Sequence, residues 1–411
     1  MSKPAIEEQV AVLMQGTEYG DAALQQAMAA ELRERLLSAE KEQRPLRVYA
    51  GYDPTSSDLH LGHTVTMRKL RQFQELGHSV VFLIGDYTAR VGDPSDKNAL
   101  RPQLLEEKIR ENARTYAEQA FRILDRGKTE VRYNSEWLSK LSFAELIRLG
   151  SNFTIQQFTT RENFRLRWDR GDAIYLHEFF YSIMQGYDAY SLRADVQVGG
   201  CEQLFNIITA GRKIMEYYGV RPNIGVLVGI LPGTDGVVRM SKSLGNHIPL
   251  MAEPNDMYGK VMSVPDAAMP LYYRLLTRLT PDRIAAVERD LASGAVHPRD
   301  AKMSLAREIV EIYHGPGQAA SAEEQFRKVF QKSELPDDIP AIAVRPEQRL
   351  ADLMVEHGLA KSKSDARRLV EQGGVRLGGG VAKDPNAVVP LEGDPVLQVG
   401  KRKFVRLKKA G

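Results

Sequence analysis

The stretch that decides the fold is Tyr49-Ala50-Gly51-Tyr52-Asp53-Pro54-Thr55-Ser56-Ser57-Asp58-Leu59-His60-Leu61-Gly62-His63. It has the pattern of an apolar strand, a turn of small and polar residues, and the start of a helix over 61–76. A second apolar run follows at 79–85, and two strands around one helix predict a parallel sheet with a right-handed crossover. Ligands bind such sheets where a strand ends and a helix begins. We therefore expect free N–H groups at this helix start to hold an anion.

Two histidines stand at the head of this helix. His60 and His63 are three positions apart, so both rings can face one cavity, and Gly62 leaves room for a flat group. Alone, this pattern is more typical of surface or capping histidines. A second motif, Arg239-Met240-Ser241-Lys242-Ser243, follows the apolar run 224–231. A basic, serine-flanked loop suits phosphates, although alone it is more typical of a solvated turn. The two motifs together favour a nucleotide site.

The two motifs resemble the His-x-Gly-His and Lys-Met-Ser-Lys-Ser signatures of the class I aminoacyl-tRNA synthetases. His60-Leu61-Gly62-His63 matches the first in full, and the second is matched except that Arg239 replaces its first lysine. Within this class the chain closely resembles the bacterial tyrosyl-tRNA synthetases from about Leu46 to the C-terminus. The resemblance implies an α/β fold: a Rossmann-like parallel-sheet catalytic domain, an α-helical domain, and a small α+β domain like ribosomal protein S4.

The composition fits this class of protein. A chain of 411 residues suggests two or three domains, and its 43% hydrophobic and 27% charged residues are typical of soluble globular proteins. The absence of an 18-residue apolar stretch and of a secretion signal predicts a cytoplasmic protein with no membrane segment. The single cysteine, Cys201, excludes an internal disulfide and a multi-cysteine zinc site, so no structural metal is expected.

The chain is predicted to divide into five parts. These are a helical leader at 1–45, a catalytic domain at 46–250, a helical domain at 251–332, a linker at 333–346 and an S4-like domain at 347–411. By resemblance, an insertion at about 125–195 in the catalytic domain makes the contacts of a homodimer, and the helical domain helps to hold the tRNA.

The C-terminal part is basic. Residues 345–411 hold 14 Lys and Arg against 8 Asp and Glu, which points to a polyanionic partner. Four cations lie on or beside a predicted helix at 362–372, within a run (359–375) that resembles the S4 RNA-binding module. A charge run can be a solvated face, but the match over the whole module favours RNA binding by Lys361, Lys363, Arg367 and Arg368.

The resemblance implies a reaction in two steps. L-tyrosine and ATP give tyrosyl-adenylate and pyrophosphate, and the tyrosyl group then moves to the 3′ end of tRNA(Tyr). ATP enters as a substrate with Mg²⁺. The attacking carboxylate is already ionised, so no general base is required. The implied catalytic residues are His60, His63, Lys242, Thr55 and Arg239. The implied ATP-binding residues are Gly51, Asp53, Gly62, Gly200, Glu202, Ser241 and Ser243.

The tyrosine site is implied in the same way. A predicted helix at 177–190 carries a polar stripe of Tyr181, Gln185 and Asp188, which on pattern alone could face solvent or a ligand. By resemblance, Tyr49 and Asp188 bind the substrate phenol, Asp93, Tyr181 and Gln185 hold the ammonium group, and Gln197 lies beside them.

Four positions depart from the family pattern: Glu202 replaces Asp, Cys201 replaces Ser or Thr, Arg239 replaces Lys and Asp96 replaces Gly. They leave open a catalytically weakened paralogue that acts as an RNA-binding protein. A tryptophanyl enzyme shares both signatures, but Tyr49, Asp188 and the basic module argue against it. A small nucleotidyltransferase is excluded by the length of the chain.

Overall fold

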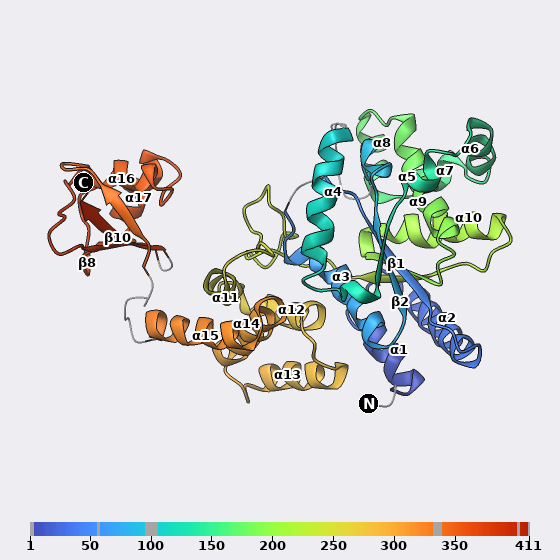
Figure 1. Cartoon of the computed structure of the whole chain (residues 1–411), viewed down its shortest axis with the longest axis horizontal. Helices are drawn as coiled ribbons and strands as arrows, with labels where there is room; N and C mark the ends of the chain where they lie inside the picture. The colour runs from blue at the N-terminus through green and yellow to red at the C-terminus, as the bar shows by residue number, and fades with distance from the viewer. Residues whose placement is uncertain (1–3, 56–57, 95–105, 332–338, 401–402, 410–411) are drawn as a thin grey trace. The chain divides into compact units, whose positions relative to one another are not determined.

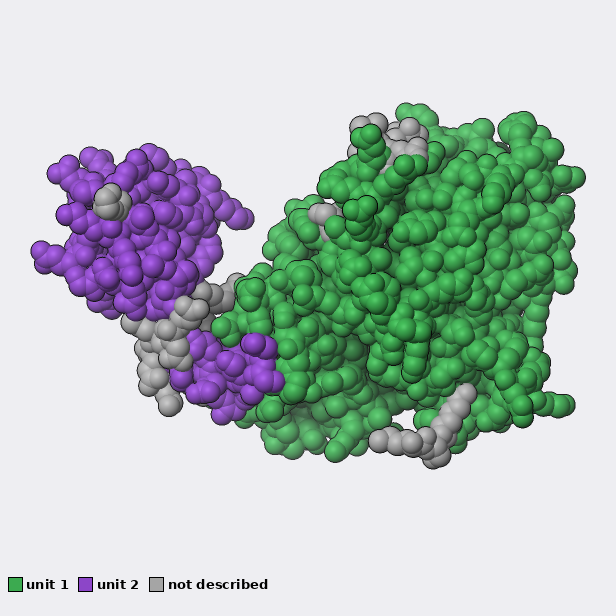
Figure 2. Space-filling view, viewed as in Figure 1, with its two compact units in different colours: residues 1–316 green, residues 317–411 purple. Residues whose placement is uncertain are grey.

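The computed structural model describes residues 4–55, 58–94, 106–331, 339–400 and 403–409. The chain forms two compact units, residues 1–316 and residues 317–411 (Figure 2). Each unit is built around its own five-stranded sheet (Figure 1).

The sheet of the first unit is parallel and has the strand order β3-β2-β1-β4-β5. Its strands are β1 (Arg47–Tyr52), β2 (Ser79–Ile84), β3 (Thr129–Tyr133), β4 (Val196–Gly200) and β5 (Ile224–Val228). The chain adds β2 and β3 on one side of β1 and then adds β4 and β5 on the other. The order therefore reverses between β1 and β4, and the crevice at their carboxyl ends is where such sheets bind ligands.

Helix α3 (Leu61–Glu75) follows β1 as predicted and packs on β1, β2 and β4. Its buried apolar side chains include Val65, Leu70 and Phe73, and each is worth about 1.5–3 kcal/mol on burial. On another face, Oγ1 of Thr64 lies 2.8 Å from the hydroxyl of Tyr313. These contacts fix the start of α3, and with it both histidines, relative to the sheet.

The remaining helices surround this sheet or follow it in the chain (Figure 1). The leader breaks where Gly20-Asp21 predicts, because Asp21 caps the second helix by accepting the N–H of Ala23 at 2.8 Å. The helices are α1 (Ile6–Met14), α2 (Ala22–Lys41), α4 (Glu106–Ala120), α5 (Ser135–Leu138), α6 (Phe143–Gly150), α7 (Ile155–Thr159), α8 (Glu162–Arg170), α9 (Leu176–Ser191), α10 (Arg212–Tyr217), α11 (Pro254–Met262), α12 (Met269–Leu276), α13 (Pro281–Ser293) and α14 (Pro298–His314).

Several strand and helix boundaries differ from the sequence prediction by a few residues. The strand expected at 194–198 spans Val196–Gly200, and Asp195 anchors its start: its carboxylate accepts the N–H of Arg47 and a guanidinium N–H of Arg35. The helix expected at 102–124 ends at Ala120, whose carbonyl accepts the N–H groups of both residues 123 and 124. Its expected first residues, 102–105, lie outside the described residues.

The second unit has a mixed sheet in the order β6-β10-β9-β7-β8. The linker predicted at 333–346 is wrong in its last part, because residues 341–344 form a strand parallel to β10, with Val344 fully buried in the core. The elements are α15 (Pro316–Gln331), β6 (Ala341–Val344), α16 (Leu350–Glu356), α17 (Lys363–Glu371), β7 (Val375–Leu377), β8 (Gly380–Val381), β9 (Val396–Val399) and β10 (Lys403–Lys409).

Candidate active site

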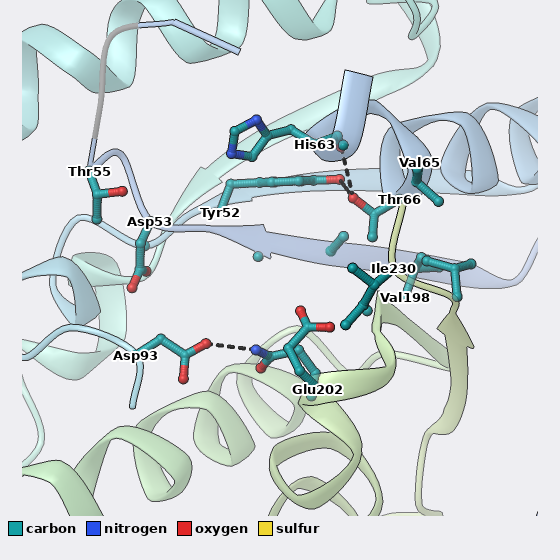
Figure 3. Close-up of a pocket in the computed structure, with 18 of the residues that line it drawn as sticks. Tyr52, Asp53, Thr55, His63, Val65, Thr66, Asp93, Val198, Glu202 and Ile230 are labelled. Carbon is teal, nitrogen blue, oxygen red and sulfur yellow. Dashed lines mark hydrogen bonds between the residues drawn. The ribbon is translucent and has the colours of Figure 1, made fainter. Parts of the chain in front are cut away.

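A cavity of about 490 Å³ lies at the carboxyl ends of β1 and β4 (Figure 3). Its walls come from both strand ends, the start of α3, helix α9 and the loop after β5. His63 and Lys242, far apart in the sequence, both line it. So does every other residue predicted for catalysis, ATP or tyrosine, namely Tyr49, Gly51, Asp53, Thr55, His60, Gly62, Asp93, Tyr181, Gln185, Asp188, Gln197, Gly200, Glu202, Arg239, Ser241 and Ser243.

The two histidines cap helix α3 reciprocally. Nδ1 of His60, the N-cap, accepts the N–H of Gly62 at 3.2 Å, and Nδ1 of His63 accepts the N–H of His60 at 3.2 Å. The N–H of Leu61 donates to the carbonyl of Ile248 at 3.0 Å. The prediction of free N–H groups at this helix start is therefore wrong, because imidazole rings and a neighbouring segment already accept them.

Both imidazoles are neutral, and their ring centroids lie 3.9 Å apart. Burial, reinforced by His63, lowers the pKa of His60 to about 3. Burial and the charge of Arg239 lower the pKa of His63 to about 4. Because Nδ1 is the acceptor in each ring, the proton is on Nε2. Such N–H groups suit hydrogen bonding to phosphate oxygens and do not titrate near neutral pH.

The second motif lies on a loop that Asn246 and Asp235 organise. Buried Asn246 accepts the N–H of Ser241 on its Oδ1 at 2.8 Å and donates from Nδ2 to the Asp235 carboxylate. Its main-chain carbonyl accepts the N–H of Thr234 at 2.8 Å. A Cβ on Gly233 would come within 2.3 Å of the Asn246 side chain, so only glycine fits there. The turn before the motif is thus defined by side chains.

Lys242 contacts the turn that precedes the first motif. Its Nζ lies 2.5 Å from Oδ2 of Asp58, and both side chains are more than half exposed. Within the motif, the hydroxyls of Ser241 and Ser243 lie 2.9 Å apart. Arg239 is close enough for its charge to lower the pKa of both histidines. The cations of one motif and the N–H donors of the other thus meet at one end of the cavity.

A pair of groups suited to a phenol lies at the ends of Tyr49 and Asp188. Tyr49 is fully buried, and its hydroxyl has no hydrogen-bond partner among the described residues. Asp188 accepts the indole N–H of Trp137 at 2.7 Å and an amide N–H of Asn134 at 3.2 Å. Burial raises the pKa of Asp188 to about 8, against the lowering by these two donors. The pair can donate to and accept from one ligand hydroxyl.

Oxygen atoms suited to a cation lie nearby. Asp53 accepts the hydroxyl of Tyr181 at 3.0 Å, and Asp93 accepts the amide of Gln203 at 2.6 Å, which Figure 3 marks with a dashed line. Oε1 of Gln185 is buried without a hydrogen-bond partner among the described residues. The polar stripe of helix α9 therefore faces the cavity and not the solvent.

Three of the four departures from the family pattern lie in the described residues: Cys201 and Glu202 directly follow β4, and Arg239 lies in the loop after β5. The Glu202 carboxylate folds over Gly200, where a Cβ would come within 2.2 Å of its Oε2. Burial raises the pKa of the Cys201 thiol to about 11, so this thiol stays protonated. On β4 itself, Oε1 of Gln197 accepts an amide N–H of Asn223 at 3.1 Å. Asp96 lies outside the described residues.

The sequence prediction missed the residues that hold these groups in place. Asn246, Asn134 and Gln203 are amides, a residue type that gave no signal; Asn134 and Gln203 also depend on partners distant in the chain, Asp188 and Asp93. Trp137 is one of only two tryptophans. A tryptophan needs an acceptor when it is buried, and that property could have marked it.

The residues predicted to bind RNA lie in the second unit. All four side chains are exposed, and all but Lys361 belong to α17. Two of them carry local ion pairs: Lys363 lies 2.6 Å from Asp352, and Arg368 lies 2.6 Å from Asp365. They form a basic surface that is partly neutralised.

Among the described residues, no group of three or more His, Cys, Asp or Glu is arranged to hold a metal ion. None of the described helices combines the length and apolar character needed to cross a bilayer.

Comparison with known families divides the chain in two. Residues 41–331 match the model of the class I tRNA synthetases (W and Y), and residues 348–396 match the S4 domain. A tyrosine–tRNA ligase of Moorella thermoacetica is 49% identical, covering 92% of this chain and 91% of the relative. One of Thermotoga maritima is 48% identical, covering 91% and 93%. Tyrosine–tRNA ligase 2 of Clostridium acetobutylicum is 44% identical, covering 98% of both.

Solved structures share the fold. A C-terminally truncated mitochondrial tyrosyl-tRNA synthetase of Aspergillus nidulans superposes with a TM-score of 0.62 at 24% identity, covering 79% of this chain and 94% of that one. The tyrosyl-tRNA synthetase of Archaeoglobus fulgidus gives 0.58 at 22% identity, covering 78% and 100%. With both signature motifs in one cavity and relatives of nearly half identity over most of their length, the chain belongs to the class I aminoacyl-tRNA synthetases, in the family of the tyrosine–tRNA ligases.

Proposed function

We propose that the protein activates L-tyrosine with ATP and transfers the tyrosyl group from tyrosyl-adenylate to the 3′ end of tRNA(Tyr). The observation that carries this proposal is the position of the Tyr49 and Asp188 pair. It lines the same cavity as His60, His63 and Lys242. One ligand can therefore present a phenol at one end while its carboxylate lies near bound phosphates.

Tyrosine is selected by the buried pair. The Asp188 carboxylate accepts the substrate hydroxyl, and the Tyr49 hydroxyl donates to it. Phenylalanine would leave both groups buried and unpaired, which costs more than the lost contact itself; tyrosyl-tRNA synthetases are the standard example of this effect. Asp93, Tyr181 and Gln185 hold the ammonium group, with Gln197 beside them.

In the first step, a carboxylate oxygen of tyrosine attacks the α-phosphorus of ATP. The new bond joins that oxygen to phosphorus, and the bond between the α-phosphorus and the bridging oxygen breaks to release pyrophosphate. The carboxylate is ionised at neutral pH, so the protein contributes position and charge. The rate then depends on donors and cations that meet the charge developing on the leaving phosphates.

Those groups come from the two motifs. Nε2–H of His60 and of His63 bind phosphate oxygens, with Thr55 beside them. Lys242, Arg239 and the hydroxyls of Ser241 and Ser243 bind the pyrophosphate. Mg²⁺ arrives with ATP as a substrate. The nucleoside lies along Gly51, Asp53, Gly62, Gly200 and Glu202, where the glycines allow close approach to the backbone.

A homodimer fits the surface of the insertion at 125–195. Helices α6 to α9 carry large apolar side chains that are mostly exposed: Phe143 (76%), Ile147 (58%), Ile155 (63%), Trp168 (62%) and Leu176 (71%). Soluble monomers rarely leave so many large apolar side chains in neighbouring helices exposed to water. We place the subunit contact on this surface.

The chain divides into domains, two of which we assign to tRNA binding. Residues 1–45 form the leader, 46–250 the catalytic domain, 251–332 a helical domain that helps to hold tRNA, and 341–411 the S4-like domain, which includes β6 because that strand pairs with β10. In that last domain, Lys361, Lys363, Arg367 and Arg368 bind phosphates of tRNA(Tyr). We propose a cytoplasmic location, where tRNA is charged for translation.

Pyrophosphate exchange with each of the twenty amino acids tests this function. We expect exchange with tyrosine and none above background with phenylalanine or tryptophan. Exchange with tryptophan would mean that the protein is a tryptophanyl enzyme, which the same family model covers. Tight tRNA binding with no exchange for any amino acid would favour a non-catalytic RNA-binding paralogue.

A further inference from the structure

Helix α8 and the turn before it reach the proposed ammonium site from the insertion. Arg161, at the N-cap of α8, is 7% exposed, and its guanidinium carbon lies 5.1 Å from the ring centroids of both Phe164 and Phe205. Taking a guanidinium out of water is costly unless hydrogen bonds or opposite charges offset the lost hydration. The guanidinium donates to Ser182, and the charge of Asp93 acts on it as well.

Four hydrogen bonds join the two residues. Arg161 Nη1 donates to Ser182 Oγ at 2.9 Å, and Ser182 Oγ donates to Asn206 Oδ1 at 2.7 Å. Asn206 Nδ2 donates to Gln203 Oε1 at 2.9 Å, and Gln203 Nε2 donates to Asp93 Oδ2 at 2.6 Å. Every donor in this relay lies on the side nearer to Arg161.

The two ends fix that direction. A guanidinium can only donate, and a carboxylate can only accept. The Ser182 hydroxyl must therefore donate onward, and each amide must present its oxygen to the arginine side and its nitrogen to the aspartate side. Without the guanidinium, the Ser182 oxygen loses its donor and the relay is held only at its Asp93 end, so Ser182, Asn206 and Gln203 are free to leave the positions that orient Asp93.

A second tie runs through the backbone. The side-chain amide of buried Asn163, two residues after Arg161, donates to the carbonyl of Pro94. Pro94 directly follows Asp93. The start of α8 thus holds this carboxylate both through its own oxygen and through the next peptide.

We infer that Arg161 is a positioning residue for the amino-acid substrate, and that through Ser182, Asn206 and Gln203 it aims Asp93 at the ammonium group. This inference rests on the proposed function, in which Asp93 binds that group. It assigns to the insertion a role in substrate affinity in addition to subunit contact.

The test is tyrosine activation by Arg161→Met, with binding of 3-(4-hydroxyphenyl)propanoate, which lacks the ammonium group, measured beside it. Loss of one hydrogen-bonding partner predicts that the KM for tyrosine rises about ten-fold. The KM for ATP and the Ki of the propanoate stay within about two-fold of the starting values, because neither ligand uses Asp93. Arg161→Lys, which keeps a cationic donor, restores most of the affinity for tyrosine.

Ser182→Ala breaks the same relay with less loss of volume and is expected to raise the KM for tyrosine about three-fold. It keeps the inference testable if Arg161→Met does not fold. Arg165→Met, an exposed arginine on the same helix, is the matched control and leaves both constants unchanged. An unchanged KM for tyrosine in Arg161→Met and Ser182→Ala, or an equal rise in the Ki of the propanoate, overturns the inference. Failure of the unsubstituted protein to activate tyrosine would instead overturn the proposed function.

Discussion

Nζ of Lys242 lies 2.5 Å from Oδ2 of Asp58, so one ion pair joins the two signature segments across 184 positions of sequence. Lys242 must leave this carboxylate to bind a pyrophosphate group. The pair is exposed, and exposed pairs are worth about 0.2–1 kcal/mol. Asp58 therefore competes weakly with the substrate for the lysine.

Replacement of the Asp58 carboxylate should strengthen the binding of ATP. We expect Asp58→Asn to lower the KM for ATP about two- to five-fold, which corresponds to the strength of an exposed pair. Thermal stability should not change measurably. A higher KM for ATP would mean that Asp58 orients Lys242 for the reaction.

Removal of the lysine should affect the reaction more than binding. Lys242→Ala is expected to slow tyrosyl-adenylate formation by about 10²–10³, the usual loss for one group that stabilises a transition state. Tyrosine affinity, measured by calorimetry, should stay within about two-fold, because Lys242 is not among the groups proposed to bind tyrosine. Equal losses in rate and affinity would refute this role.

Trp137 should act through Asp188. Its indole N–H stabilises the charged carboxylate, so Trp137→Phe should raise the pKa of Asp188 further above its value of about 8. Because the ionised form accepts the phenol, kcat/KM for tyrosine should rise with pH through this pKa, and its midpoint should move upward in the variant. A profile between pH 6.5 and 9.5 measures both midpoints; coincident midpoints would contradict the assignment.

The histidine pair should make the protein sensitive to acid. The pKa values of the two histidines in the folded protein, about 3 and about 4, lie below the ordinary 6.5. At a pH between about 4 and 6.5 the unfolded chain therefore binds more protons than the folded protein. Stability is therefore lost as the pH falls from about 6.5 toward 4. Urea unfolding at pH 7 and pH 5 should show a loss of about 2 kcal/mol per histidine, which His60→Asn/His63→Asn removes. An equal loss in the variant would exclude this cause.

The S4-like domain should be needed for charging and not for activation. A chain that ends at Gln331 should keep pyrophosphate exchange, while tyrosylation of tRNA falls by about 10² or more because phosphate contacts are lost. The cut must precede Ala341, because β6 pairs with β10 and would otherwise lose its neighbour. Full charging by this shorter chain would show that the S4-like domain is not needed for tRNA recognition.

The sequence predicted much of this site because its decisive features are local. The strand, turn and helix of 49–76 follow from apolar spacing, and the two signature motifs are short and contiguous. The reversal of strand order between β1 and β4 then brings together residues that follow different strands. The family resemblance assigned His63, Lys242 and Asp188 to one site, and all three line the cavity.

The positions that could not be predicted depend on long-range pairing. The relay between Arg161 and Asp93 passes through helices α8 and α9 and the segment after β4, and no spacing along the chain encodes it. The sequence left capping open as the alternative to a nucleotide site for the two histidines, because helix propensity favours Ser, Thr, Asp and Asn at the N-cap; the structure shows that they cap the helix and line the cavity together. The strand at 341–344 was missed because the prolines around it suggested a linker.

The reciprocal caps of His60 and His63 explain why the motif has its length. The interval between the two residues is the interval from N-cap to N3, the distance at which two side chains can each satisfy the other's end of a first turn. Insertion of a single residue between them would open that turn and turn one imidazole away from its neighbour at the same time. The spacing of this nucleotide-binding signature is thus a property of helix initiation, and its chemistry is carried by the ring nitrogens that initiation leaves unused.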